Sequence, residues 1–186
     1  MAVFSAVLFL VSFLVNFNLM KKVKEDRVNI KTLIKSAYYD MVTELPNRDN
    51  ILLMLNDQIQ RVSRREKSFI LTVIKISNYF DVKVHSLELA NNFMREASDR
   101  ILDSIRDEDN VGQYSDDSFV ILFNEYLSEE NYEIVIKRIE EAFGEKPHLH
   151  TKYEIEYEIS IGKAIYPLDA KNSEKLLEVA MTNALK

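Results

Sequence analysis

The sequence predicts a domain of the α/β class, with helices packed around one central sheet. Two stretches, Ser68–Ile76 and Phe119–Phe123, have the apolar and β-branched composition of buried strands. A third stretch, Tyr153–Ile161, alternates apolar residues with acidic ones and predicts a strand with one solvent-exposed face. Segments with apolar residues at helical spacing lie between and after the strands, at about Leu87–Arg106, at Glu129–Phe143 and from about Ser173. This order of strands and helices is typical of a layered domain with a single core.

The composition excludes several classes of function. With 186 residues, the chain is long enough for one ordinary domain and an appendage. Its formal net charge of −6 argues against general nucleic-acid binding, because phosphate contacts need clustered Lys and Arg side chains. The lack of cysteine excludes disulfides and thiolate metal sites, and three widely separated glycines exclude a glycine-rich phosphate-binding loop.

Residues 1–20 contain an apolar run that is long enough to cross a membrane. The run from Ala2 to Met20 is interrupted only by serine and asparagine, and as a helix it spans a hydrocarbon core of about 30 Å. A cleaved signal peptide is the alternative, but no basic segment precedes the run and no small-x-small cleavage site follows it. We therefore expect a single span of the inner (cytoplasmic) membrane, with the rest of the chain in the cytoplasm. The cations that indicate this orientation are Lys21, Lys22, Lys24 and Arg27.

Residues 21–39 form the predicted connection between the membrane span and the domain. Apolar residues recur there at intervals of three and four positions, with Arg27 filling one place, at Val23, Ile30, Ile34, Ala37 and Met41. This spacing is typical of a coiled coil, but it lasts for fewer than three heptads. Two interpretations stay open: a helix that lies on its own domain, or a stalk helix that forms a homodimer and carries a signal from the membrane.

The stretch Asn110–Phe123 predicts a β-hairpin with an acidic turn. The expected strands are Val111–Tyr114 and Phe119–Phe123. The second strand is wholly apolar, which indicates a buried central position in the sheet. Two adjacent carboxylates, Asp116 and Asp117, lie on the turn between the strands. Carboxylates in this position are typical of a site for a metal ion and phosphate groups.

The hairpin resembles the signature of the GGDEF domain family, the diguanylate cyclases. The five residues from Ser115 to Phe119, Ser-Asp-Asp-Ser-Phe, stand where the family has Gly-Gly-Asp/Glu-Glu-Phe. The stretch Asp40–Arg48 is similar to the opening motif Asp-x-Leu-Thr-Gly-Leu-Pro-Asn-Arg, and departs from it only at Val42 and Glu44. Ser160–Ala164 and Tyr166-Pro167 also resemble family motifs. The resemblance covers residues 40–186 and implies an α+β sandwich related to the polymerase palm, with a mainly antiparallel sheet flanked by helices.

The resemblance also implies that most catalytic groups are missing. Family members condense two GTP molecules with the help of magnesium ions bound by acidic residues. Lys75 stands in the place of the first magnesium-binding aspartate, and Asp117 is the one acid that remains. A divalent ion needs carboxylate oxygens and is repelled by an ammonium group. We therefore expect no metal site, no magnesium cofactor and no turnover. The positions that depart from the family pattern are Lys75, Ser77, Ser115, Asp116 and Ser118.

A more specific expectation concerns Lys75 and Asp117. An aspartate left alone beside apolar strands loses hydration without compensation. We therefore expect the Lys75 ammonium to form an ion pair with Asp117, in the place of the metal. The family's guanine-reading asparagine corresponds to Lys83, and its aspartate partner corresponds to Asn91 or Asn92, with the register left open.

Arg106 and Asp109 match a second site of the family, an inhibitory Arg-x-x-Asp motif that binds the product cyclic di-GMP. An arginine donates to guanine O6 and N7, and a carboxylate accepts from guanine N1–H and N2–H. The alternative is structural: an arginine at the end of a helix pairs with a nearby loop aspartate and binds no ligand. Both interpretations stay open. His148 and His150 have no third metal ligand nearby in the sequence and are expected in a solvated loop.

Three functions compete on these observations. The first is a receptor that binds cyclic di-GMP through Arg106 and Asp109 and reports to a partner protein. The second is a scaffold or interaction subunit of a membrane assembly, which needs no ligand. The third, the alternative to both, is an enzyme: an active diguanylate cyclase that makes cyclic di-GMP from two GTP molecules, or a nucleotide hydrolase. The losses around Lys75 and Asp117 favour the first two, so we expect a protein without enzymatic activity.

Overall fold

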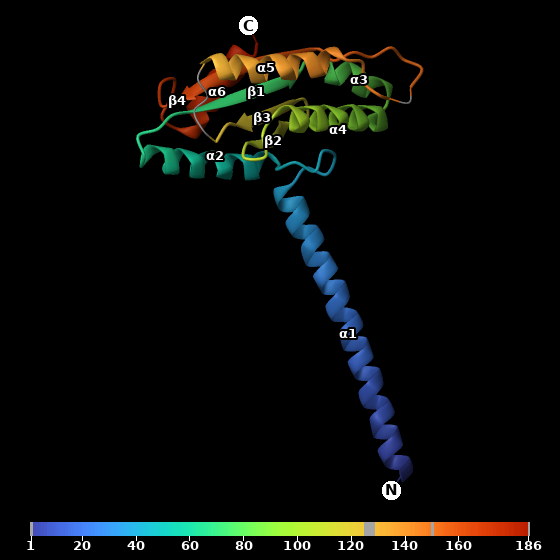
Figure 1. Ribbon diagram of the computed structural model, residues 1–186. Coiled ribbons are helices and arrows are strands. Elements are labelled where there is room, and N and C mark those ends of the chain that lie inside the picture. Colours follow the sequence, from blue (N-terminus) through green and yellow to red (C-terminus); the bar gives the residue numbers. More distant parts are fainter. Residues whose placement is uncertain (1, 125–128, 150, 186) are drawn as a thin grey trace. The chain divides into compact units, whose positions relative to one another are not determined.

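The computed structural model describes residues 2–124, 129–149 and 151–185. The chain divides into two compact units, Met1–Tyr38 and Tyr39–Lys186 (Figure 1). The first unit is a single helix, α1 (Ala2–Tyr38). Side chains at positions 2–12, 14, 15, 28 and 31 lie outside the described part.

The membrane span predicted for residues 1–20 falls mostly on those undescribed side chains. Within the described residues, no helix combines the length and the apolar composition that a membrane crossing requires. The membrane span therefore stays a prediction.

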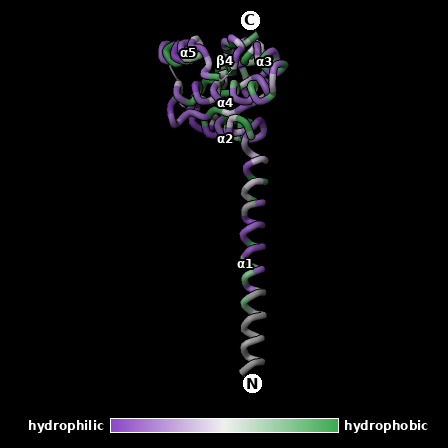
Figure 2. Tube along the Cα trace, turned by 90° about the vertical axis from the view of Figure 1, so that its right-hand side faces the viewer, coloured by the Kyte–Doolittle hydropathy of each residue, from purple (hydrophilic) through white to green (hydrophobic). Residues whose placement is uncertain are grey.

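The predicted heptad positions of α1 are open to solvent in the single chain. Val23, Ile30 and Ile34 expose 47%, 55% and 53% of their surface. Figure 2 shows hydrophobic residues interspersed among hydrophilic ones along this part of the helix. The apolar stripe is thus not buried within the first unit, and its role in dimerisation stays a prediction.

The second unit is built on a four-stranded sheet with the order β2-β3-β1-β4. All three neighbouring pairs are antiparallel, and β1 pairs with both β3 and β4. The two central strands are almost wholly buried, as the apolar composition predicts. The strands are β1 (Phe69–Ile76), β2 (Asn110–Ser115), β3 (Ser118–Leu122) and β4 (Ile159–Tyr166).

Helices cover both faces of this sheet (Figure 1). One core cluster joins one face of β1 and β3 to α3, α4 and α5, and the other joins the opposite face to α2 and α6. Side chains of Asn47, Ser86 and Asn172 cap the first turns of α2, α4 and α6. The helices are α2 (Arg48–Ser63), α3 (Tyr79–His85), α4 (Leu87–Ser104), α5 (Glu129–Gly144) and α6 (Ser173–Asn183).

Gly162 lets α6 lie directly against β4. A Cβ atom at this position would collide with the backbone of Ala180, Asn183 and Ala184. Relief of that collision would require the helix itself to move, because the atoms in the way belong to the backbone. The glycine of the Ser160–Ala164 motif is therefore a packing requirement between helix and strand.

The fold class is confirmed, as are the hairpin and the antiparallel sheet flanked by helices. The prediction of a strand at Tyr153–Ile161 is wrong in its position, because β4 begins at Ile159. Strand β1 ends at Ile76, which pairs with Ile159, so the ladder between β1 and β4 stops before residues 153–158. Asn78 holds this segment instead: its Nδ2 donates to the Glu156 carbonyl (2.7 Å), and its Oδ1 accepts from the Glu158 N–H (3.3 Å).

Candidate functional site

The acidic turn consists of Asp116 and Asp117, between the end of β2 and the start of β3. The hairpin register shifts between Gln113 and Ser115, which places a bulge just before the turn. The hydroxyl of Ser115 donates to Asp117 Oδ1 (2.7 Å). The backbone carbonyl of Asp117 accepts from the Ile76 N–H (2.8 Å), so the turn is fastened to the end of β1.

Lys75 forms the predicted ion pair with Asp117. Lys75 lies opposite Ser118 in the β1–β3 register, next to the acidic turn. Its Nζ lies 3.6 Å from Asp117 Oδ2. The Asp117 side chain is 15% exposed and that of Lys75 is 37% exposed, so the pair lies at the edge of the solvent. The ammonium compensates a carboxylate that burial would otherwise leave with reduced hydration.

Asp116 has a cationic partner of its own. Lys83, on α3, donates to Asp116 Oδ2 at 3.0 Å. This hydrogen bond is the largest reason why the pKa of Lys83 is raised above its ordinary value. The Lys83 ammonium also lies over the rings of Tyr79 and Phe80, at 5.4 and 5.8 Å from their centres. Each of the two turn carboxylates is therefore matched by a lysine.

The space beside the Lys75–Asp117 pair is small. A cavity of about 60 Å³ adjoins the pair. The residues that line it are Val73, Lys75, Asp117, Ser118, Met181, Ala184 and Leu185.

These residues do not fit a magnesium ion. Asp117 is the one carboxylate among the residues that line the cavity, and its Oδ2 lies 3.6 Å from the Lys75 ammonium. Magnesium requires several oxygen ligands in near-octahedral geometry. Among the described residues, no group of three or more acidic, His or Cys side chains is arranged to hold a metal ion.

Ser77 lies just past the end of β1. Its hydroxyl is 3.4 Å from that of Ser160, and its N–H donates to the carbonyl of Glu158 (2.7 Å). The position thus fastens the segment before β4 to the end of β1.

Arg106 and Asp109 lie together after α4, but their side chains have different partners. Asp109 Oδ2 accepts from the backbone N–H of Arg106 (3.3 Å), and its Oδ1 accepts from that of Asn124 (3.2 Å). Burial raises the pKa of Asp109 above its ordinary value, although these two hydrogen bonds oppose the change. The Arg106 guanidinium lies 3.8 Å from Glu108, and the Arg106 side chain is 57% exposed. Asp109 therefore holds the loop together, whereas Arg106 is accessible to a ligand.

A second polar cluster, at Glu96 and Arg100 on α4, was not predicted from the sequence. Arg100 donates to the carbonyls of Ala142, Glu145 (2.8 Å) and Lys146 (3.0 Å), just where α5 ends. It also donates to Glu96 Oε1 at 2.7 Å. Glu96 and Arg100 are four positions apart in the sequence, and this spacing is typical of an ordinary ion pair on the surface of a helix. The spacing therefore gave no indication of the contacts with residues after position 140.

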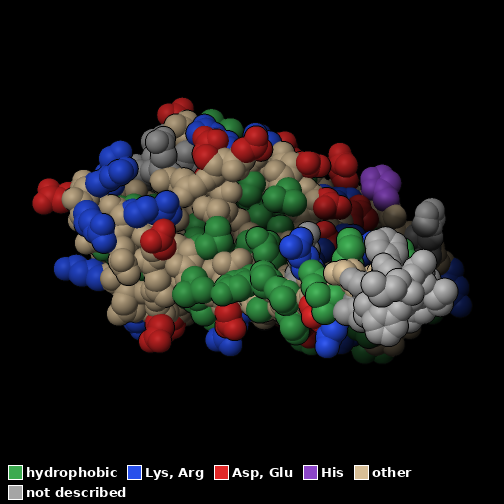
Figure 3. Space-filling view, turned by 90° about the horizontal axis from the view of Figure 1, so that it is seen from below, with side chains coloured by type: hydrophobic (Ala, Val, Ile, Leu, Met, Phe, Trp, Pro, Cys, Tyr) green, Lys and Arg blue, Asp and Glu red, His purple; other side chains and the backbone are tan. Residues whose placement is uncertain are grey.

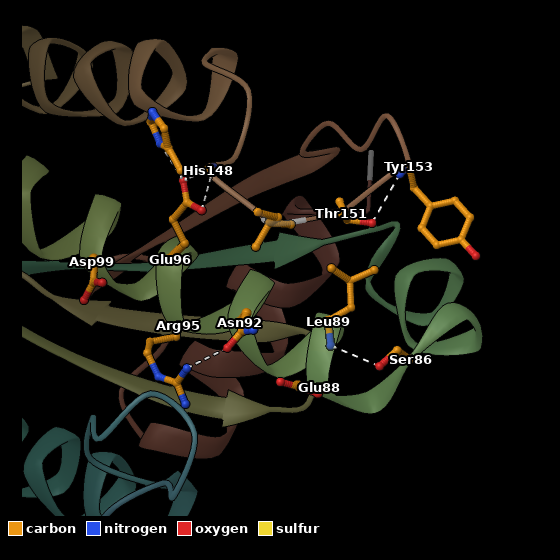
Figure 4. A pocket seen from close by; sticks show the side chains of 11 residues that line it. Ser86, Glu88, Leu89, Asn92, Arg95, Glu96, Asp99, His148, Thr151 and Tyr153 are labelled. Carbon is orange, nitrogen blue, oxygen red and sulfur yellow. Dashed lines mark hydrogen bonds and ion pairs between the residues drawn. The ribbon is translucent and has the colours of Figure 1, made fainter.

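Glu96 connects α4 to the segment after α5. Its two oxygens accept from the N–H of His148 at 2.8 and 3.0 Å, and Figure 4 shows the side chain reaching toward that residue. A pocket of about 590 Å³ opens between α4 and this segment. Burial by itself raises the pKa of Glu96, but hydrogen bonds from His148 and Arg100 outweigh burial and leave that pKa below its ordinary value. His148 lies in an exposed loop as expected, and His150 lies outside the described residues.

Comparison with known proteins gives the family. The model of the family described as "Diguanylate cyclase, GGDEF domain" matches residues 37–186. The bifunctional diguanylate cyclase/cyclic di-GMP phosphodiesterase MucR of Pseudomonas aeruginosa is 26% identical over 151 residues. That match covers 79% of this chain and 21% of MucR, so the chain spans about a fifth of the length of this relative.

Solved structures share the fold. The GGDEF domain of TpbB (or YfiN) from Pseudomonas aeruginosa matches with a TM-score of 0.73 and 19% identity, over 79% of this chain and 86% of that one. The coiled coil and GGDEF domain of DgcB from Caulobacter crescentus, solved with c-di-GMP, matches with a TM-score of 0.75 and 15% identity, over 90% and 89% of the two chains. The family model covers residues 37–186, most of the chain, and the chain therefore belongs to the GGDEF domain family.

Proposed function

We propose that this protein acts in cyclic di-GMP signalling without synthesising cyclic di-GMP. The observation that carries the proposal is the ion pair of Lys75 with Asp117, next to a cavity of about 60 Å³. A lysine ammonium there supplies positive charge where the family's chemistry needs a bound divalent ion. Loss of metal ligands removes several kcal/mol of transition-state stabilisation. Several such losses together leave no route to turnover.

In this proposal the domain is a scaffold or interaction subunit whose acidic turn is a structural element. Both turn carboxylates have lysine partners, so neither needs a bound metal ion to balance its charge. The N-terminal part serves as a single-span anchor in the inner membrane, with the domain in the cytoplasm. Its partners are other proteins or a second copy joined through residues 21–39, and nucleic acid is not among them.

A second candidate function is a receptor for cyclic di-GMP. The observation that favours it is the exposure of the Arg106 side chain, whose guanidinium lies 3.8 Å from a surface glutamate, Glu108. Arg106 is therefore able to turn toward a guanine base. Asp109 is less available, because both of its oxygens already accept backbone hydrogen bonds.

Two assays on the purified full chain separate these functions. Incubation with GTP and Mg²⁺, followed by chromatography, should yield neither cyclic di-GMP nor GDP. Formation of cyclic di-GMP would support the alternative, an active diguanylate cyclase. Calorimetric titration with cyclic di-GMP then distinguishes receptor from scaffold: binding that is weakened by Arg106→Ala indicates a receptor, and the absence of heat indicates a scaffold. Arg138→Ala, at an exposed position of α5, is the matched control.

A further inference from the structure

Thr43 and Gln113 connect two segments of the domain that lie far apart in the sequence. The first segment is the N-terminal turn, defined here as residues 40–46. Asp40 closes it: its N–H donates to the Leu45 carbonyl (2.8 Å), and its Oδ1 accepts from the Thr43 N–H (2.8 Å). The second segment is the hairpin with the acidic turn.

Gln113 contacts both segments at once. Its backbone N–H donates to the carbonyl of Pro46 (2.8 Å). Its side-chain Oε1 accepts from the Thr43 hydroxyl (2.8 Å), and its Nε2 donates to the Ser115 carbonyl (3.3 Å). The side-chain amide of Gln113 thus accepts a hydrogen bond from the N-terminal turn and donates one within the hairpin.

The polar contacts continue to the Lys75–Asp117 pair. The Ser115 hydroxyl donates to Asp117 Oδ1 (2.7 Å), and Asp117 Oδ2 lies 3.6 Å from Lys75 Nζ. On the other side, the Thr43 hydroxyl lies 3.0 Å from Asp40 Oδ1, so its single proton is shared between Asp40 and Gln113. The result is a chain of polar contacts from Asp40 to Lys75, which enters Ser115 at its backbone carbonyl and leaves it at its hydroxyl.

The N-terminal turn depends on such support. Glu44 has φ 59°, in the left-handed region that residues with a side chain rarely adopt. A residue keeps such a conformation only where its surroundings hold it. Thr43 is 7% exposed, so its hydroxyl is held in a largely dry environment where loss of a partner is costly.

We propose that Gln113 is a positioning residue that couples the N-terminal turn to the acidic turn. A change at Asp40 then alters the Lys75–Asp117 pair, and a partner bound at the acidic turn alters the N-terminal turn in return. Helix α1 ends at Tyr38, so this turn is the first part of the domain that follows it in the chain. The coupling requires neither catalysis nor cyclic di-GMP, and goes beyond the proposed function in that respect.

A double-mutant cycle in the full chain tests the coupling. Thr43→Val removes the hydroxyl and keeps the shape, and Asp117→Asn removes the charge that pairs with Lys75. Distant, independent changes multiply in their effect on the unfolding equilibrium constant, whereas members of one network do not. We expect the double variant to differ from the product of the single effects by about threefold or more. Agreement with the product to within about twofold overturns the proposal.

Controls separate coupling from local damage. Glu178→Gln changes an exposed ion pair of α6. The effect of Thr43→Val combined with Glu178→Gln on the unfolding equilibrium constant should equal the product of the two single effects. Thr43→Ser keeps a hydroxyl and should restore the coupling. If Thr43→Val fails to fold, Gln113→Leu with Asp117→Asn provides the same cycle.

Amide hydrogen exchange supplies an independent readout. In Thr43→Val we expect faster exchange at residues 115–118 as well as at residues 40–46. Faster exchange confined to residues 40–46 would show that Thr43 has a local role only, and would also overturn the proposal.

Discussion

Two pairs of opposite charge in this domain have very different surroundings. Glu96 and Arg100 meet at 2.7 Å, and Arg100 also donates to three backbone carbonyls at the C-terminal end of α5 and just beyond it. Lys75 and Asp117 meet at 3.6 Å, and the lysine side chain is 37% exposed. The first pair connects α4 to the end of α5 through several hydrogen bonds. The second is a looser pair on the hairpin where the family has its catalytic acids.

The difference indicates that the two pairs contribute unequally to the stability of the fold. Arg100 fastens the end of α5 to α4, so its removal affects two helices. Lys75 supplies one charge beside Asp117, and the hairpin around it is also held by backbone ladders to β1. We therefore expect stability to depend strongly on the first pair and weakly on the second.

The largest expected effect comes from Arg100→Met. The substitution removes the donors for three carbonyls and leaves Glu96, 20% exposed, without its cation. Breaking a largely buried, hydrogen-bonded charge pair costs about 3–5 kcal/mol of unfolding free energy. Chemical denaturation measures this cost. Lys137→Met, at an exposed pair of α5, is the control and should change stability by less than about 1 kcal/mol. If Arg100→Met also lowered the unfolding free energy by less than about 1 kcal/mol, the expected difference between the Glu96–Arg100 and Lys75–Asp117 pairs would be wrong.

The next effect is a pH dependence that belongs to Glu96. Its pKa lies below the ordinary value of 4.5, because hydrogen bonds from His148 and Arg100 outweigh burial. The ionised carboxylate therefore stabilises the folded state above that value, and the contribution is lost as the pH falls through the lowered pKa. Unfolding free energy should fall more steeply between about pH 5 and about pH 3 in the wild type than in Glu96→Gln.

Asp109 provides a control of opposite sign for this titration. Burial raises its pKa, so protonation of Asp109 favours the folded state as the pH falls. Asp109→Asn should therefore make the acid-induced loss of stability steeper than in the wild type. Equal slopes in the wild type and in Glu96→Gln would show that Glu96 does not carry the expected contribution.

The smallest effect is expected from Lys75→Met. The pair is partly exposed and its two charged atoms are 3.6 Å apart, which limits its value to about 1 kcal/mol or less. The Ser115 hydroxyl still donates to Asp117 in the variant. Thermal unfolding of the variant measures the difference, with Lys175→Met at an exposed pair as control. If Lys75→Met lowered the unfolding free energy by about 3 kcal/mol or more, Lys75 would be as important for stability as Arg100.

Much of the fold was predictable because the apolar patterns are strong. The strand β1 alternates between two cores, β3 is apolar after Ser118, and the apolar face of α4 packs into one of these cores. Helix α3 was not predicted, since seven residues are too few to show a helical period. The segment 153–158 has the pattern of a strand, but its partner, Asn78, is a side chain that no pattern reveals.

The site was predictable only where a motif gave the position. The Lys75–Asp117 pair followed from the place of Lys75 in the family pattern and from the cost of burying a lone aspartate, and it is confirmed. The Lys83–Asp116 pair was not predicted, because α3 brings these residues together. The contacts of Gln113 with Thr43 depend on tertiary structure in the same way.

The most direct test of the central claim is the response of the domain to Mg²⁺ and GTP. In the wild-type chain we expect no change in melting temperature with Mg²⁺ and GTP together, and no cyclic di-GMP in the reaction mixture, because Lys75 supplies the positive charge beside Asp117. A melting temperature that rises with Mg²⁺ and GTP, accompanied by cyclic di-GMP formation that Asp117→Asn abolishes, would contradict the account.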